Sequence, residues 1–130
     1  LAEEKGVDIG ANIDAAVTLR GSVDEIRVLF ANLIDNAVRY TPPGGQVDMS
    51  LHRREGRSVV EILDTGPGLP PGSETRIFDR FYRAAPPGVE GSGLGLAIAR
   101  RIAERNSLRL SVENRPDGRA GVLARVMLPE

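Results

Sequence analysis

At 130 residues, the chain is long enough to bury one substantial hydrophobic core, and we treat residues 1–130 as one domain. A formal net charge of −1 disfavours a nucleic-acid binder that acts through bulk electrostatics. The absence of cysteine excludes disulfides and thiolate metal sites, and no apolar stretch approaches the roughly 20 residues that span a bilayer.

The first third of the chain predicts two short strands and then a long helix. Strand-like runs cover residues 7–13 and 15–20. Ser22 and Glu25 form an S-x-x-E capping box, which is typical of the start of a helix. Apolar residues then recur at helical spacing: Ile26, Leu29, Phe30, Leu33, Ile34 and Ala37. The helix is expected to end near Tyr40, because the following Thr-Pro-Pro-Gly-Gly cannot continue it.

The rest of the chain predicts strands and helices around a segment rich in glycine and proline. Half of all glycine and proline residues lie between Asp64 and Gly95, and irregular segments of this length are usually functional lids. The expected elements, in chain order, are strands over 47–53 and 58–63, helices over 74–83 and 94–106, and strands over 108–113 and 121–128. In the later helix, Leu94, Ile98 and Ile102 are expected to share one apolar stripe. These elements predict an α+β fold, a two-layer α/β sandwich with a mixed sheet covered on one face by helices.

Two asparagines lie four residues apart in the first predicted helix. At 100° per residue, Asn32 and Asn36 lie about 40° apart on a polar stripe that borders the apolar face, with Arg39 and Tyr40 beside them. Asparagine is a mediocre helix former, so a pair in mid-helix needs a reason. Amide oxygens are hard, neutral donors that suit Mg²⁺. We predict a ligand surface here; the alternative is a pair of solvated or side-chain-bonded asparagines.

Asp64 ends a predicted strand and is followed by Thr-Gly-Pro-Gly. A carboxylate at a strand end accepts hydrogen bonds, and the exocyclic amine of a purine is a suitable donor. Gly66 and Gly68 permit positive φ angles and let a flat ring approach the backbone. The pattern favours a base-binding turn, and a plain turn after a strand would have the same sequence.

The block Gly-Ser-Gly-Leu-Gly-Leu over residues 91–96 opens the second long helix. Backbone N–H groups and the positive end of a helix can face an anion in such a position. The block is not a Walker loop, since GxxxxGK[ST] is missing, and it is not a dinucleotide fingerprint, since Leu96 stands where glycine is required. Phosphate binding is predicted, with a flexible hinge as the alternative.

Aromatic and basic residues alternate between Arg76 and Arg83. The apolar members, expected to pack the lid down or dock a partner, are Ile77, Phe78, Phe81 and Tyr82. Arg80 and Arg83 are expected to reach phosphates, unless they are ordinary surface arginines. His52 is the only histidine and is expected to be a solvated strand residue.

Four blocks in this order resemble the N, G1, F and G2 boxes of the catalytic ATP-binding domain of sensor histidine kinases, within the Bergerat-fold ATPases. They are NLIDNAVRY (32–40), DTGPGL (64–69), RIFDRFYRA (76–84) and GSGLGLAIAR (91–100). The resemblance implies a mixed, mostly antiparallel sheet of about five strands, about three helices on one face, and a flexible ATP lid. Two departures stand out: Arg39 replaces a frequent lysine, and Asn106-Ser107 replaces a common His-Gly turn.

The resemblance also implies roles for individual residues. Asn36 would ligate Mg²⁺ with help from Asn32, and Arg39 would contact phosphates; these three form the expected catalytic group. Tyr40 would flank the adenine and Asp64 would bind its amino group. The residues expected to contact the nucleotide are Asn36, Arg39, Tyr40, Asp64, Gly66, Gly68, Leu69, Phe78, Arg80, Phe81, Gly91, Ser92, Gly93, Leu94, Gly95 and Leu96.

The implied activity is transfer of the γ-phosphoryl of Mg-ATP to a histidine of a separate dimerisation domain. No His-Glu-x-x-x-Pro block occurs, so we expect a fragment whose acceptor histidine precedes Leu1. The implied parent is an inner-membrane sensor with a cytoplasmic kinase core and a response-regulator partner, and the isolated domain is expected to be monomeric. The alternatives are a chaperone- or topoisomerase-like ATPase, which carries glutamate where Asn32 stands, and a nucleotide-binding module without transfer activity.

Overall fold

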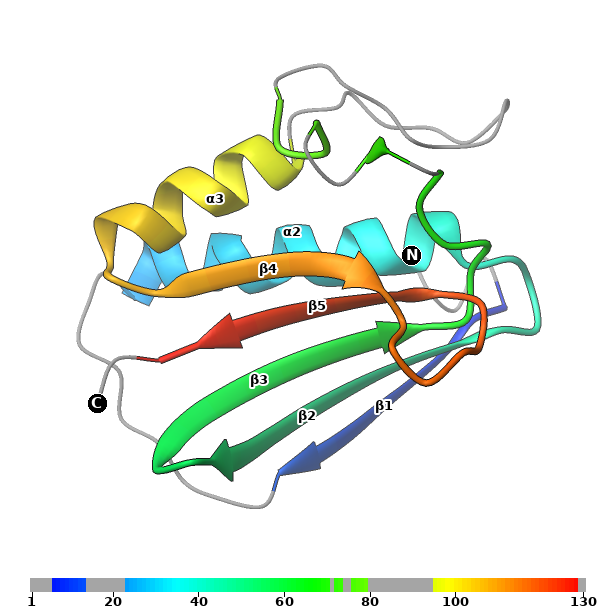
Figure 1. Cartoon of the computed structure of the whole chain (residues 1–130), viewed down its shortest axis with the longest axis horizontal. Helices are drawn as coiled ribbons and strands as arrows, with labels where there is room; N and C mark the ends of the chain where they lie inside the picture. Colours follow the sequence, from blue (N-terminus) through cyan, green and yellow to red (C-terminus); the bar gives the residue numbers. More distant parts are fainter. Residues whose placement is uncertain (1–5, 14–22, 71, 74–75, 80–94, 129–130) are drawn as a thin grey trace.

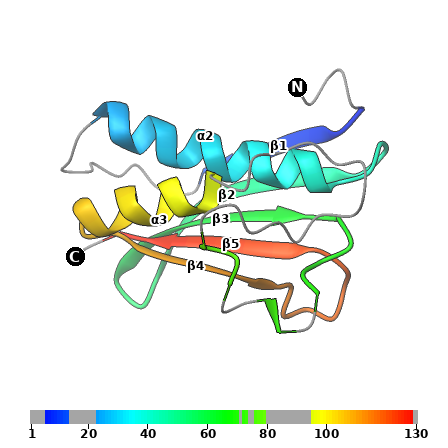
Figure 2. The same ribbon diagram turned by 90° about the horizontal axis from the view of Figure 1, so that it is seen from above.

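Two helices cover one face of a five-stranded sheet in the computed structural model (Figure 1). The structure describes residues 6–13, 23–70, 72–73, 76–79 and 95–128. In the view turned by 90°, the two helices lie side by side over the sheet (Figure 2), and they pack against each other. The predicted two-layer α/β sandwich is therefore confirmed.

The sheet is mixed, with strand order β1-β2-β3-β5-β4. Its strands are β1 (Asp8–Ile13), β2 (Gln46–Arg54), β3 (Arg57–Asp64), β4 (Arg109–Asn114) and β5 (Val122–Met127). β1 runs parallel to β2, and the remaining neighbours are antiparallel. Each described strand agrees with a predicted one to within a residue or two. The strand expected over 15–20 lies outside the described residues.

The strand register separates two faces of the sheet, because successive side chains point in opposite directions. Val60 and Ile62 face the helices and belong to the hydrophobic core, whereas Glu61 between them faces away. On that outer face, Glu61 pairs with His52 at 3.3 Å and with Arg125 at 2.8 Å. The expectation of a solvated His52 is therefore incomplete, because the neighbouring strand supplies an acid that the local sequence does not show.

The first helix, α2 (Val23–Tyr40), has the predicted extent and buries Leu29, Leu33 and Ala37. The second, α3 (Gly95–Arg105), also lies where it was expected. Its buried side differs from the prediction: Ala99, Ile102 and Ala103 are buried, whereas Ile98 is 42% exposed. The prediction considered only large apolar side chains and therefore overlooked Ala99 and Ala103. These two alanines, at i and i+4, lie on the buried face of the helix.

The short helix expected over 74–83 lies largely outside the described residues. Its described part, residues 76–79, forms turns, with Arg76 N–H and Ile77 N–H both donating to the Ser73 carbonyl. Two of the about three expected helices are thus seen in the part of the chain that the structure describes.

Candidate functional site

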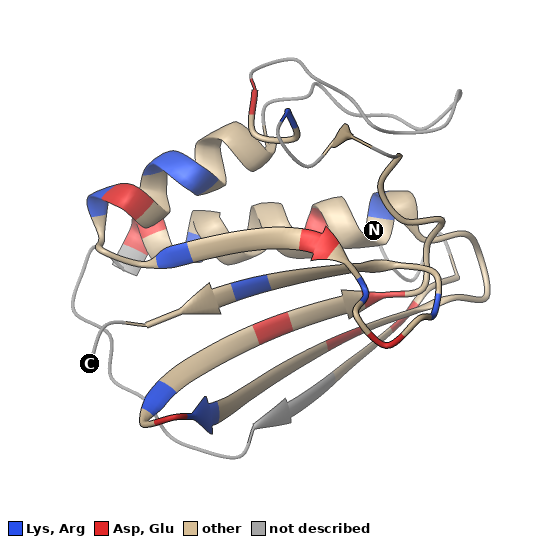
Figure 3. Cartoon of the chain, in the orientation of Figure 1, with Lys and Arg blue, Asp and Glu red and all other residues tan. Residues whose placement is uncertain are grey.

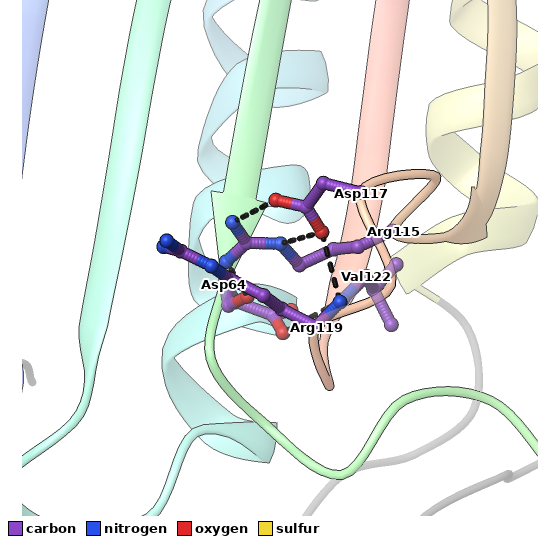
Figure 4. A network of polar contacts seen from close by, with 5 residues as sticks. All are labelled: Asp64, Arg115, Asp117, Arg119 and Val122. Carbon is purple, nitrogen blue, oxygen red and sulfur yellow. Dashed lines mark hydrogen bonds and ion pairs between the residues drawn. The ribbon is translucent and has the colours of Figure 1, made fainter.

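The carboxyl end of β3 carries a buried carboxylate. Asp64 is 4% exposed, and its Oδ1 accepts a hydrogen bond from the backbone N–H of Gly66 at 3.0 Å. The same oxygen accepts a second hydrogen bond from the backbone N–H of Val122, also at 3.0 Å (Figure 4). Each donor belongs to a different segment, since Gly66 follows β3 and Val122 begins β5. One carboxylate oxygen therefore joins the loop after β3 to the neighbouring strand.

The second carboxylate oxygen of Asp64, Oδ2, differs from Oδ1 in its hydrogen bonding. No residue in the described ranges donates a hydrogen bond to Oδ2. Among those same residues, every fully enclosed side-chain nitrogen or oxygen has a hydrogen-bond partner, so Oδ2 keeps access to solvent. A ligand N–H group can therefore bind to this oxygen without breaking an existing contact.

Burial raises the pKa of the Asp64 carboxyl above its ordinary value, because the charged form is desolvated. The hydrogen bonds from Gly66 and Val122 and the charge of Arg115 act in the opposite direction without cancelling this effect. A buried carboxylate held in this way, with one oxygen open, is a strong acceptor for a charge-assisted hydrogen bond.

The backbone after Asp64 passes close to the end of α2. A Cβ at Gly66 would lie 2.5 Å from the Tyr40 carbonyl oxygen, so only glycine fits between them. At this end of α2, Thr41 is fully buried and its hydroxyl donates a hydrogen bond to the Ala37 carbonyl at 2.8 Å. The predicted base-binding turn and the predicted polar helix are thereby brought into contact at Tyr40.

The middle of α2 lies beside the start of α3. Asn32 Oδ1 is 3.6 Å from the position of a Cβ on Gly95, which is the first residue of α3. Asn36 and Arg39 are half-buried on the same helix, and Leu96 packs against the core. The first turn of α3, as the structure describes it from Gly95 onward, contains no acidic residue.

The described edge of the glycine-rich segment is anchored on the helices. Ile77 is buried in the core and Phe78 packs against it. The Arg100 guanidinium lies 5.3 Å from the centre of the Phe78 ring, within the range of a cation–π contact. The other predicted nucleotide contacts of this region lie outside the described residues: Arg80, Phe81, Gly91, Ser92, Gly93 and Leu94.

Two residues near the site were missed at the sequence level. Asn114 hydrogen-bonds Leu69 through both backbone groups, and Arg115 Nη1 donates to the Asp64 carbonyl oxygen at 3.2 Å. Their partners are 45 and 51 residues away in the chain, and no local spacing encodes such a pairing. The available clue was their position beside a Pro-Asp-Gly turn that the strand pairing brings next to Asp64.

One of the four predicted blocks, residues 32–40, is the second half of α2, and two others approach this half of the helix. Tyr40 meets Gly66 at one end, and Asn32 meets Gly95 further back. No cluster of three or more His, Cys, Asp or Glu side chains that could hold a metal occurs in the described ranges. The site therefore offers a buried carboxylate at one end, and amide groups beside a helix N-terminus at the other.

Comparison with known proteins found a family match and similar structures that cover most of the chain. Residues 21–130 match the family described as Histidine kinase-, DNA gyrase B-, and HSP90-like ATPase. The sensor protein QseC of Salmonella typhi is 39% identical over 118 residues, which cover 90% of this chain and 25% of QseC. The mycobacterial sensor histidine kinase MprB superposes with a TM-score of 0.84 at 28% identity, covering 98% of this chain and 85% of the MprB structure. Full-length ShkA in complex with AMPPNP superposes with a TM-score of 0.78 at 29% identity, covering 98% of this chain and 26% of ShkA.

The chain spans about a quarter of the length of QseC, a curated relative that it matches. No helix in the described ranges is long and apolar enough to cross a membrane.

Proposed function

Because the chain belongs to the histidine kinase-, DNA gyrase B- and HSP90-like ATPase family, we propose that it is the ATP-binding catalytic domain of a sensor histidine kinase. Family membership and the similarity to MprB confirm the resemblance noted in the sequence and the Bergerat fold. The observation that carries the proposal is the buried carboxylate of Asp64, with one oxygen held by the fold and one open. The structural relative ShkA was solved with AMPPNP, an ATP analogue, which supports a nucleotide in this site.

The Asp64 end of the site is proposed to bind adenine. Its open Oδ2 accepts a hydrogen bond from the exocyclic amino group of the base. Guanine presents a carbonyl oxygen at the corresponding position, which a carboxylate repels, so the site favours ATP over GTP. The base lies against Gly66 and Gly68, flanked by Tyr40, with Leu69 completing the pocket.

The α3 end of the site is proposed to bind the phosphates. Residues 91–96 wrap them with backbone N–H groups, and Arg39 and Arg80 supply positive charge. The amide oxygens of Asn36 and Asn32 fit Mg²⁺, a hard cation that keeps phosphate and water oxygens in its shell and, when bound, neutralises phosphate charge. Phe78 and Phe81 anchor the lid over the nucleotide.

The proposed reaction is transfer of the γ-phosphoryl group to a histidine of a separate dimerisation domain. The bond between the γ-phosphorus and the bridging oxygen breaks, a nitrogen–phosphorus bond forms on the acceptor, and ADP leaves. Such a transfer needs mainly positioning and charge neutralisation, so this chain need not supply a nucleophile. His52 does not fit that role, since it lies on the outer face of the sheet beside Glu61.

The parent protein is proposed to be an inner-membrane sensor that holds residues 1–130 as one cytoplasmic domain and passes the phosphoryl group to a response regulator. The isolated domain is proposed to be monomeric and not to bind nucleic acid. Support for the last point comes from the described residues, where basic and acidic positions are interspersed along the ribbon (Figure 3).

The Asp64→Asn variant tests the proposal. It removes the charge from the acceptor of the base amino group, a hydrogen bond worth about 1.5–3 kcal/mol, so ATP affinity should fall about 10- to 100-fold. Titration with ATP, followed by chemical shifts of the glycine amides, measures the dissociation constant. An unchanged dissociation constant would contradict the assignment of Asp64 to the base.

A further inference from the structure

The segment from Asp64 to Leu69 is held at both ends by one hairpin, formed by β4, β5 and the turn between them. At the Leu69 end, the Asn114 side chain binds both backbone groups of a single residue. Leu69 N–H donates to Asn114 Oδ1 at 2.6 Å, and Asn114 Nδ2 donates to the Leu69 carbonyl at 3.3 Å. A side-chain amide thereby replaces the strand that would otherwise pair with this stretch of backbone.

Gly68 provides the space for this clamp. Its φ of +85° is a conformation that favours glycine, and a Cβ there would lie 2.8 Å from Asn114 Oδ1. The sequence assigned Gly68 to the base pocket alone. The structure adds a second reason for glycine, since any side chain would push against the Asn114 amide.

At the Asp64 end, the same hairpin holds the backbone and the carboxylate (Figure 4). Arg115 Nη1 donates to the Asp64 carbonyl at 3.2 Å, and Asp117 fixes the Arg115 guanidinium through contacts of 2.7 and 3.2 Å. Val122 N–H holds Oδ1 of Asp64. A Cβ at Gly121 would collide with the Asp64 carbonyl, so the hairpin and the segment touch backbone to backbone.

From this two-ended attachment we infer that Asn114 is a positioning residue for base recognition, and that the β4–β5 hairpin sets the base selectivity of the site. The inference deepens the proposed function and rests on it. Residues 65–68 span the gap between two points fixed on one rigid hairpin, so the backbone that faces the base is ordered before the nucleotide arrives. Pre-ordering of this kind increases nucleotide affinity, because less conformational entropy of the backbone is lost when the nucleotide binds.

The Leu69 clamp is exposed, and so is Asn114 itself. Its loss should therefore change global stability little and act mainly on the local order of residues 65–69. Asn114→Ala should weaken ATP and ADP binding by the same factor, about 3- to 10-fold, because the defect lies at the base end and not at the phosphates. The ratio of the GTP to the ATP dissociation constant should fall. With an acceptor domain present, KM for ATP should rise while kcat at saturating ATP stays the same.

Two further variants make the experiment decisive. Asn106→Ala is a matched control, because it removes a side-chain bond to the Ile102 carbonyl at the far end of α3 and should leave nucleotide selectivity unchanged. Gly68→Ala disturbs the clamp from the other side and should reproduce the loss of selectivity. In the Asn114→Ala background its effect should shrink, because the clash partner is gone.

Hydrogen exchange at the Leu69 amide, measured without nucleotide, reports on the clamp directly and should be faster in Asn114→Ala. The inference would be overturned if Asn114→Ala left both the ATP affinity and the ratio of the GTP to the ATP dissociation constant unchanged. This conclusion requires that Asp64→Asn weakens ATP binding in the same assay. If Asp64→Asn also has no effect, the proposed function fails and the inference fails with it.

Discussion

Folding and the proposed ligand binding place opposite requirements on the carboxyl group of Asp64. The fold uses Oδ1 to join two segments, and the proposed ligand uses Oδ2, yet the whole carboxyl is buried. Burial raises its pKa, so the folded chain holds this proton more tightly than the unfolded chain does. Stability contributed by this group is therefore highest in acid and falls as pH rises from the ordinary aspartate pKa, about 3.9, through the raised value of the folded state. The charged form that the proposed ligand requires is therefore the form that burial disfavours.

Asp64→Asn should therefore leave the domain at least as stable as the parent at pH 7, while it loses ATP affinity. The amide oxygen can take the place of Oδ1, because both Gly66 and Val122 donate to that position. The substitution removes the buried charge. Urea unfolding measured over a series of pH values gives the difference in stability, which should shrink as the pH falls and Asp64 takes up its proton. A variant that is clearly less stable than the parent at pH 7 would show that the ionised carboxylate stabilises the fold.

At the residue scale, the sequence predicted the residues whose chemistry is local. Asp64 and Gly66 were proposed as site residues because a carboxylate at a strand end and a glycine after it restrict what the turn can do. Asn114 and Arg115 were not identified, because their role depends on partners brought near by sheet pairing. Gly68 is an intermediate case. The sequence predicted that this position needs glycine, but it did not predict the close approach to Asn114.

At the element scale, α2 was predicted well and the packing of α3 was not. The boundaries of α2 were predicted from an S-x-x-E sequence pattern and a proline-rich stop, which are both local signals. The buried face of α3 includes Ala99 and Ala103 as well as Ile102, and the prediction considered only the larger apolar side chains of this helix. Helix existence is a local property, whereas the buried face of a short helix is a tertiary one.

The contact between Arg100 of α3 and Phe78, at the described edge of the glycine-rich segment, leads to a further prediction. Arg100→Ala removes the cation–π contact with Phe78, worth about 0.5–1 kcal/mol at an exposed site, and should lower the free energy of unfolding by about that amount. Amide exchange at residues 77–79 should become faster. Chemical denaturation and exchange measured by NMR check both effects.

Two controls separate the ring contact from other consequences of losing Arg100. Glu104→Gln removes only the Arg100–Glu104 ion pair, 3.2 Å long and exposed, and should change stability by no more than about 0.5 kcal/mol. Arg101→Ala removes an exposed arginine from the same helix. Equal acceleration of exchange at residues 77–79 in all three variants would mean that helix α3 is generally loosened and that the ring contact has no specific role.

At the scale of the whole molecule, the sheet separates the proposed site from the only histidine. In the β2–β3 pairing, Val47 lies opposite Asp64 and His52 lies opposite Val59. Five residues of strand therefore separate His52 from the Asp64 end, a distance of about 17 Å at 3.3 Å per residue. His52 also points to the outer face, where it meets Glu61, while the helices and the proposed site lie on the other face. The periodicity of the strands predicted these two faces, whereas the contact between His52 of β2 and Glu61 of β3 on the outer face follows from the strand register.

This separation predicts how labelled ATP will behave. The chain alone, incubated with ATP labelled on the γ-phosphate, should retain no covalent label, whereas a dimerisation domain of its parent protein should acquire label on its own histidine when the two are mixed. His52→Gln should leave that transfer unchanged and cost at most about 1 kcal/mol of stability, as expected for the loss of a partly exposed polar contact with Glu61. Label on His52 would contradict the proposed geometry. Steady release of free phosphate by the chain alone, at a rate matching the transfer, would instead favour an ATPase of the chaperone or topoisomerase type. The two outcomes differ because a kinase domain holds the γ-phosphoryl for a nucleophile that another domain brings, and the face that carries Asp64 contains no histidine among its described residues.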